Sequence, residues 1–246
     1  MPIIWYETID STNNEALRHI SELDNLSVLA ATEQTAGRGQ RGNEWKSAAG
    51  DNLTFSIVLK FGAGAQPALA VRDQFRITLA STLAVHGFLA DRGVQAKIKW
   101  PNDIYAGNRK ICGMLIENGI DSAFLKWSVI GIGINVNQTD FRSDMINAAS
   151  IAGITGKKYP LRESLDSFMD CFMTRLPSVW DSPDALLEEY HANMFRKGTV
   201  CEYVDCASGE TFRAAIIGIT PDARLRLSLA GGEERTYAFK EVSYVI

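Results

Sequence analysis

The sequence predicts an α+β fold, in which a mixed or antiparallel sheet backed by helices precedes a small antiparallel β-barrel. Short β-type runs fill residues 97–136, whereas helical patterns occupy other parts of the chain. After Gly198 the pattern changes to short strands divided by turns, which is typical of a small barrel. At roughly 150 residues per domain, 246 residues suit one large and one small domain, which we place at 1–196 and 197–246.

The first part of the chain contains three strand candidates and two helix candidates. Apolar runs predict strands at 3–9, 28–32 and 53–61. Thr12 and Glu15 have the spacing of a capping box ahead of a helical segment, 16–23. A second helix is expected to begin at Gln66 and to end before Gly93. Its apolar face would contain Val71, Phe75, Leu79 and Leu83.

The remaining elements are read from the same patterns. Strands are predicted at 97–100, 103–105, 110–117 and 124–136, with hairpin turns between the later ones. Helical patterns cover 162–176 and 185–195. The second of these follows Ser182 and Pro183, a cap residue with proline at the first helical position. In the C-terminal module, strands are expected at 199–204, 212–220, 224–229 and 235–242.

Composition and charge exclude several classes of protein. The formal net charge is −4, so no global positive field would attract nucleic acid or an anionic membrane. The four cysteines and three histidines lack the spacing of a zinc site or a disulfide framework, and we predict no resident metal. The N-terminus has no signal-peptide pattern, and no apolar run approaches the ~18 residues of a membrane span. We therefore expect a cytoplasmic protein without a nucleic-acid or membrane partner.

A glycine-rich segment at 37–42 formally fits the G-x-G-x-x-G pattern of dinucleotide-binding proteins. That pattern requires a helix to begin inside it, but no helical apolar stripe follows, and Arg38 and Arg41 occupy a turn that is usually bare. The segment better fits a flexible loop that binds anions, with arginine forks for carboxylate or phosphate oxygens and Trp45 as a lid or stacking surface. A solvated basic surface loop with one buried tryptophan is the alternative.

A second candidate cluster surrounds a proline. Pro101 is expected to keep Trp100 extended, which would place Asn102 and Asp103 at the end of a strand. Lys110 leads into an apolar strand, where poor hydration of its ammonium group favours an anionic ligand. The alternative is an ordinary Asn-Asp turn with solvated basic neighbours.

A third candidate is a strand with bare backbone. Gly131 and Gly133 alternate with Ile132 and Ile134, so the glycines share one face and the isoleucines the other. Such a face lets a ligand or another chain approach closely, whereas tight packing against a helix would explain it equally.

Four motifs in this order resemble those of biotin–protein ligases. They are GRGQRGNEW at 37–45, KWPNDIY at 99–105, RKICGMLIE at 109–117 and GIGINV at 131–136. The resemblance covers about residues 1–195, and the C-terminal module fits the small SH3-like domain of that family. It implies a catalytic domain related to class II aminoacyl-tRNA synthetases and lipoate ligases. It also implies MgATP and biotin as small-molecule substrates, and a biotin carboxyl carrier domain of a biotin-dependent carboxylase as acceptor.

Such a ligase would convert biotin and ATP to biotinyl-5′-AMP and pyrophosphate, after which a lysine of the acceptor displaces AMP. A carboxylate and a triphosphate repel each other, so positive charge must lie where they meet. We assign this clamp to Arg38 and Lys110, with Mg²⁺ assisting. Asp103 is the candidate that orients or deprotonates the acceptor lysine, whose unperturbed pKa is about 10.4. The predicted catalytic residues are therefore Arg38, Lys110 and Asp103.

The resemblance also implies binding residues. For biotin they are Ser11, Thr12, Asn13, Gln34, Arg38, Gly39, Gln40, Lys110, Gly113, Gly131 and Gly133. For ATP they are Arg41, Trp45, Asn102 and Asn135. Thr12 already has a structural explanation as part of a capping box, although one hydroxyl can donate and accept at once. The polar segment 138–147, with Phe141, is a candidate to close over the adenine.

Two features depart from the family's usual pattern, and other functions stay open. Gln40 stands where many relatives carry a basic residue, which lowers the charge of the clamp. The ligase-like pattern begins within the first fifteen residues, so we expect no N-terminal DNA-binding domain and no transcriptional repression. The alternatives are a lipoate or octanoate ligase, a non-catalytic RNA-binding protein, and a biotin sensor without turnover. Exposed strand edges suit a monomer or a homodimer.

Overall fold

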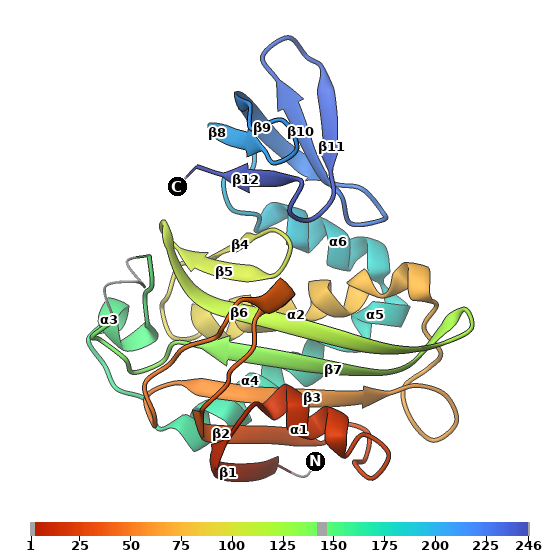
Figure 1. Ribbon diagram of the computed structural model, residues 1–246, viewed down its shortest axis with the longest axis vertical. Helices are drawn as coiled ribbons and strands as arrows, with labels where there is room; N and C mark the ends of the chain where they lie inside the picture. Colours follow the sequence, from red (N-terminus) through yellow and green to blue (C-terminus); the bar gives the residue numbers. More distant parts are fainter. Residues whose placement is uncertain (1–2, 142–146, 246) are drawn as a thin grey trace.

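Two β-sheets organise the chain (Figure 1), which the computed structural model describes for residues 3–141 and 147–245, without the side chain of Arg41. The larger sheet has seven strands in the order β1-β2-β3-β7-β6-β5-β4. They are β1 (Ile3–Ile9), β2 (Val28–Gln34), β3 (Leu53–Lys60), β4 (Lys97–Lys99), β5 (Asp103–Ala106), β6 (Arg109–Asp121) and β7 (Phe124–Ile134). The β1–β2 pair is parallel and the other pairs are antiparallel, so the sheet is mixed and the predicted α+β class is confirmed.

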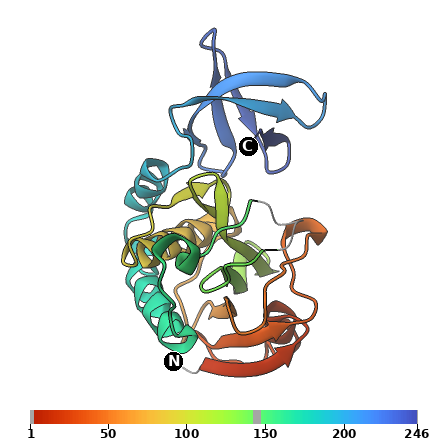
Figure 2. The same cartoon turned by 90° about the vertical axis from the view of Figure 1, so that its left-hand side faces the viewer.

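Helices cover one face of the larger sheet, on the left in Figure 2. The helix at residues 12–18 packs on the opposite face. The helices are α1 (Thr12–Arg18), α2 (Phe75–Ala90), α3 (Ile151–Thr155), α4 (Leu161–Arg175), α5 (Ser178–Asp181) and α6 (Pro183–Ala192). Successive side chains of β3 point to opposite faces of the larger sheet. Phe55 packs on Phe168 of α4 with ring centroids 5.1 Å apart, whereas the Ser56 hydroxyl bonds to α1. Because both faces are covered, residues 53–59 are all buried.

A second sheet lies above the larger one in Figure 1 and is antiparallel throughout, in the order β11-β10-β9-β8-β12. Its strands are β8 (Val200–Asp205), β9 (Thr211–Ile219), β10 (Leu225–Leu229), β11 (Glu234–Tyr237) and β12 (Val242–Tyr244). Buried apolar side chains of both sheets form one continuous cluster. The division into domains at residues 196 and 197 stays a prediction, although the two sheets lie on either side of it.

The long helix predicted from Gln66 begins nine residues later, at Phe75. The preceding residues are extended, because Gln66 bridges to Phe61 and Ala70 bridges to Phe124. Only a short 3-10 turn, Val71–Asp73, precedes the helix. The apolar spacing that included Val71 therefore crossed two different elements.

The predicted capping box at Thr12 and Glu15 is wrong. Ser11 is the N-cap residue, Thr12 is the first helical residue, and no side chain caps this end of α1. The Thr12 hydroxyl instead lies 3.2 Å from Oε1 of Gln34, and Glu15 accepts a hydrogen bond from Tyr6. Tertiary partners thus replace the local ones that the sequence pattern suggested.

Smaller differences from the sequence prediction concern turns and short elements. The peptide bond between Trp100 and Pro101 is cis, and β4 ends before it at Lys99. The predicted strand 235–242 is divided into β11 and β12. The short helices α3 and α5 have no counterpart in the sequence prediction, since each is only about one turn long. Within the described ranges, no helix is both long and apolar enough to cross a membrane.

Candidate functional site

A cavity of about 150 Å³ lies over the larger sheet. Its floor is formed by Gly113 of β6 and by Gly131 and Gly133 of β7, which place no side chain there. Most of the predicted site residues line it together. They are Ser11, Thr12, Asn13, Gln34, Arg38, Gly39, Gln40, Trp45, Asn102, Asp103, Lys110, Gly113, Gly131 and Gly133. Asn135 lies outside this lining, and the side chain of Arg41 lies outside the described part of the chain. Residues far apart in sequence thus meet because β6 and β7 pair in register, with Gly113 opposite Gly133.

One wall of the cavity is a hydrogen-bonded row of polar side chains from α1, β2 and β3. Thr12 donates to Oε1 of Gln34 from its backbone N–H at 2.8 Å and from its hydroxyl at 3.2 Å. The Ser56 hydroxyl lies 2.7 Å from Oγ1 of Thr12 and 2.6 Å from Oδ1 of Asn13. Thr12, Asn13 and Ser56 are buried and Gln34 is partly exposed, and their mutual bonds hold them in fixed positions.

Asn13 crosses from this wall to the glycine floor. Its Nδ2 donates to the Leu115 carbonyl at 3.2 Å and to the Glu117 carboxylate at 2.9 Å. A Cβ atom at Gly131 would lie 2.2 Å from Oδ1 of Asn13, which is closer than real contacts allow. Gly131 is therefore required for the approach of Asn13 to the sheet, so at this position close packing of helix α1, the alternative explanation, accounts for the missing side chain.

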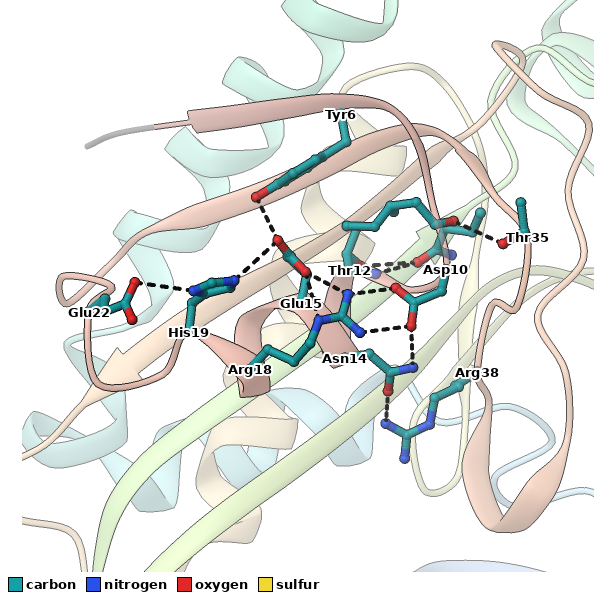
Figure 3. Close-up of polar contacts among 12 residues, drawn as sticks. Tyr6, Asp10, Thr12, Asn14, Glu15, Arg18, His19, Glu22, Thr35 and Arg38 are labelled. Atoms are coloured by element: carbon teal, nitrogen blue, oxygen red, sulfur yellow. Dashed lines mark hydrogen bonds and ion pairs between the residues drawn. The ribbon is translucent and has the colours of Figure 1, made fainter.

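Arg38 of the glycine-rich loop is bound by a carboxylate from the sheet. Its Nη2 lies 2.8 Å from Oε1 of Glu117, and its Nη1 donates to Oδ1 of Asn14 at 2.8 Å. In Figure 3, Asn14 donates a hydrogen bond to the Asp10 carboxylate, which also forms an ion pair with Arg18. Arg18 and Asn14 hold the pKa of the Asp10 carboxyl well below its usual range. The loop arginine is thus fastened to α1 and to β6 rather than extended into solvent.

Trp45 covers the other glycines. A Cβ atom at Gly133 would meet Cε2 of its indole at 2.2 Å, and one at Gly113 would meet Cζ3 at 3.1 Å. The indole Nε1 is buried and has no hydrogen-bond partner in the described part of the protein. The Trp45 indole thus occupies the space directly over Gly133.

Lys110 and Asp103 form an ion pair at the far side of the floor. The Nζ atom of Lys110 lies 2.7 Å from Oδ1 of Asp103, and both side chains are partly exposed. Lys99 faces the same cavity and is opposite Asp103 in the β4–β5 register. Burial is the main cause that lowers the pKa of Lys99; the Asp103 carboxylate opposes this shift, and nearby Lys110 adds to it. Burial also raises the pKa of Tyr105, on the same strand as Asp103, to about 12.

The predicted nucleotide residues have separate surroundings. Asn102 donates to the Met114 carbonyl at 2.5 Å, which fixes its side chain at the cavity edge. Asn135 is buried and donates to the Ala149 carbonyl at 3.0 Å, while its Oδ1 has no partner among the described residues. Oε1 of Gln40 is also buried without a partner there. A ligand that supplies a donor would satisfy these oxygens. In the segment 138–147, proposed as a cover for adenine, residues 142–146 lie outside the described residues.

Four residues of the site were not identified from the sequence: Asn14, Ser56, Lys99 and Glu117. Asn14 and Lys99 stand beside motif residues, so adjacency alone was an available signal. Ser56 and Glu117 lie within apolar strands, where a polar residue in an otherwise apolar run was the only signal that they belong to the site. Their partners lie 44 and 79 residues away, which no local pattern reveals.

The donor set does not suit a resident metal ion. In the described ranges, no three His, Cys, Asp or Glu side chains gather closely enough to hold one. The carboxylates lining the cavity are Asp103, already paired with Lys110, and Glu44. Mg²⁺ is commonly held by one or two carboxylates together with substrate phosphates. A single carboxylate such as Asp103 therefore fits only an ion that arrives with a phosphate ligand.

Comparisons with known proteins point to one family. The model of the biotin/lipoate A/B protein ligase family matches residues 5–135. The bifunctional ligase/repressor BirA of Bacillus spizizenii is 32% identical, with 96% of this chain and 72% of that protein covered. BirA of Salmonella typhimurium is 33% identical over 73% of this chain, which spans only 58% of that relative's length. The biotin–[acetyl-CoA-carboxylase] ligase of Paracoccus denitrificans is 32% identical, with 66% and 68% covered.

Solved structures agree with the fold. A biotin protein ligase from Aquifex aeolicus, in complex with biotin and ATP, matches 98% of this chain and 97% of its own with a TM-score of 0.78 and 23% identity. A biotin protein ligase from Leishmania major, in complex with biotinyl-5-AMP, matches 96% of this chain and 98% of its own with a TM-score of 0.61 and 23% identity. The chain therefore belongs to the biotin/lipoate A/B protein ligase family, among the biotin protein ligases.

Proposed function

We propose that this protein activates biotin with ATP to biotinyl-5′-AMP and then transfers biotin to a lysine of a biotin carboxyl carrier domain. The observation that carries the proposal is the arrangement of the cavity. A floor of three glycines lies between a row of polar side chains on one wall and basic side chains on the other. Such a site offers a flat apolar slot, donors and acceptors for a polar ring, and positive charge for two anions.

Biotin has a ureido ring, which needs donors and acceptors, and an apolar tail that ends in a carboxylate. We assign the ureido ring to the wall formed by Ser11, Thr12, Asn13 and Gln34, with Gly39 and Gln40 of the loop beside it. We assign the rings and tail to the surface around Gly113, Gly131 and Gly133, beside the Asn13 and Trp45 side chains that lie over two of these glycines. A lipoate ligand has no ureido ring, so it would leave this polar wall without a polar ligand partner.

In the first step, a carboxylate oxygen of biotin bonds to the α-phosphorus of ATP while pyrophosphate leaves. Lys110 and Arg38 reduce the repulsion between the two anions, and Arg41, Trp45, Asn102 and Asn135 are assigned to the nucleotide. Both clamp residues are paired with carboxylates beforehand, so the substrate anions replace Glu117 and Asp103 as their partners. Mg²⁺ brought by ATP would neutralise phosphate charge, with Asp103 as its protein ligand.

In the second step, the acceptor lysine attacks the acyl carbon, and the bond to AMP breaks. The attacking amine must be neutral, so its proton must first be removed. We assign this role to Asp103, one of the two described carboxylates that line the cavity, and release from Lys110 frees it to orient this amine. The glycine-rich loop lies over the same cavity and would shield the reactive anhydride from water.

The direct test incubates the protein with biotin, MgATP and a biotin carboxyl carrier domain, and follows the mass of the acceptor. We expect one biotinyl group on one lysine. Lipoate in place of biotin is the matched control, and a mass gain with lipoate alone would favour a lipoate ligase. No gain with either acid, together with tight biotin binding, would leave a sensor without turnover as the function.

Replacing Arg38 with alanine tests the clamp. The variant is expected to lose adenylation or to release biotinyl-5′-AMP into solution, because Arg38 then no longer closes the cavity. Chromatography of the reaction separates free from bound intermediate. Unchanged turnover and unchanged retention would contradict the assignment. The acceptor carboxylase, the monomeric or homodimeric state and the cytoplasmic location stay predictions. The similarity to a biotin–[acetyl-CoA-carboxylase] ligase supports that acceptor class.

A further inference from the structure

The positive charges around the cavity are not equally compensated. Its described basic side chains are Arg38, Lys99 and Lys110. Arg38 pairs with Glu117 at 2.8 Å, and Lys110 pairs with Asp103 at 2.7 Å. Lys99 forms neither an ion pair nor a hydrogen bond through its ammonium group within the described ranges. Of the three, Lys99 is thus the one whose ammonium group makes no direct ion pair there, although Asp103 lies opposite it in the β4–β5 register.

Aromatic rings hold Lys99 in place. Its Nζ atom lies 5.2 Å from the centroid of the Tyr105 ring and 4.8 Å from that of the Tyr244 ring. Ring faces attract an ammonium ion, so they favour the protonated form of the lysine. They do not replace the hydration that burial removes. An anionic ligand group would therefore find a cation that is fixed in position and incompletely solvated.

The proposed function supplies an anion to which neither Arg38 nor Lys110 is assigned. Biotin's carboxylate and the α-phosphate meet at Lys110 and Arg38, whereas the β- and γ-phosphates leave together as pyrophosphate. As the bond from the α-phosphorus to the bridging oxygen breaks, the electron pair stays on pyrophosphate, so negative charge grows there. Lys99 lies opposite Asp103 on the neighbouring strand and thus beside the Lys110 ion pair.

We propose that Lys99 binds the β- and γ-phosphates of ATP and stabilises pyrophosphate as it leaves; this inference rests on the proposed function. Lysine suits the task because its ammonium group acts as a compact point charge for phosphate. No proton is transferred in this step, since the new bond forms between a carboxylate oxygen and the α-phosphorus. Because Tyr244 belongs to β12, the C-terminal sheet contributes to this phosphate subsite.

The test separates the two half-reactions in a Lys99→Met variant. Biotin-dependent exchange between ATP and pyrophosphate reports adenylation, and transfer from preformed biotinyl-5′-AMP to the carrier domain reports the second step. We expect kcat/KM for pyrophosphate in exchange to fall about tenfold to a hundredfold, as for loss of a charge-assisted hydrogen bond. Transfer from the preformed intermediate should change by about twofold or less, and Lys99→Arg should restore part of the exchange.

Lys97→Met is the matched control, because Lys97 is on the same strand but is exposed, and its Nζ lies 3.4 Å from the Ala192 carbonyl. It should leave both half-reactions unchanged. Unchanged exchange in Lys99→Met would overturn the proposal. A loss confined to transfer would do the same and would make Lys99 a base for the acceptor amine. An equal loss in both steps with a lowered melting temperature would show a merely structural role.

Calorimetric titration with inorganic pyrophosphate alone keeps the inference separate from the proposed function. The wild-type protein should bind pyrophosphate, and Lys99→Met should bind it about tenfold or more weakly. This measurement needs neither biotin nor turnover. A wild-type protein without biotin-dependent exchange would refute the proposed function, whereas equal pyrophosphate binding by both proteins would refute the role of Lys99.

Discussion

Alanine at Gly131 is expected to destabilise the protein much more than alanine at Gly133, although the two glycines lie two residues apart on β7. Neither glycine has a positive φ angle, so the difference is steric. A Cβ atom at Gly131 would lie 2.2 Å from Oδ1 of Asn13, and one at Gly133 would lie 2.2 Å from Cε2 of Trp45. The two side chains that must move are held very differently.

Asn13 is held by three hydrogen bonds, at 3.2 Å to Leu115, 2.9 Å to Glu117 and 2.6 Å to Ser56. Each net contribution is about 0.5–1.5 kcal/mol, so displacing Asn13 should cost roughly 2–4 kcal/mol. Trp45 has an unpartnered Nε1 in the described structure, so moving it loses packing and a contact between its ring and the Lys110 ammonium group, 5.9 Å from the ring centroid, together on the order of 1 kcal/mol. Removing a glycine also stabilises by about 0.4–1 kcal/mol through the unfolded state, which offsets much of the cost at Gly133.

Urea unfolding of the two variants and the wild type measures this difference directly. We expect the free energy of unfolding to fall by roughly 2–4 kcal/mol for Gly131→Ala and by less than about 1 kcal/mol for Gly133→Ala. Under the proposed function, Gly133→Ala should raise the KM for ATP instead, because Trp45 is displaced. Equal losses of stability, or a larger loss at Gly133, would refute the view that Asn13 is the fixed element and Trp45 the movable one.

Three other predictions follow from local contacts. Glu117→Gln should speed tryptic cleavage after Arg38, because the loop loses its ion pair; an unchanged rate would contradict this role. His191 accepts a hydrogen bond from the Ile219 N–H at 3.0 Å, and burial lowers its pKa, so stability should fall as the pH drops below about 6.5. His191→Gln should weaken that pH dependence in urea unfolding; an unchanged dependence would be inconsistent. Gly87→Ala in α2, where a Cβ atom meets nothing within 4 Å, should raise the free energy of unfolding by about 0.5–1 kcal/mol; a loss of stability would disprove it.

Strong local patterns predicted their elements well. The apolar run 53–61 is strand β3, and Ser182 with Pro183 marks the start of α6. The helix predicted from Gln66 failed because an i, i+4 spacing continued by chance across extended residues that pair with distant strands. The capping box at Thr12 failed for the same reason, since a long-range partner, Gln34, took the hydroxyl that the local pattern assigned to the helix end.

The sequence by itself determined the fold class, the succession of most elements and the motifs that bring glycines, Arg38 and Lys110 into one site. These depend on residue types and short spacings, which act through backbone preference and apolar periodicity. Only the tertiary structure decided the partners of the basic groups: Arg38 pairs with Glu117 and Lys110 with Asp103, whereas Lys99 lies near the faces of Tyr105 and Tyr244. Those pairings follow from strand order and register, which are set by packing across the whole sheet rather than by neighbours in the chain.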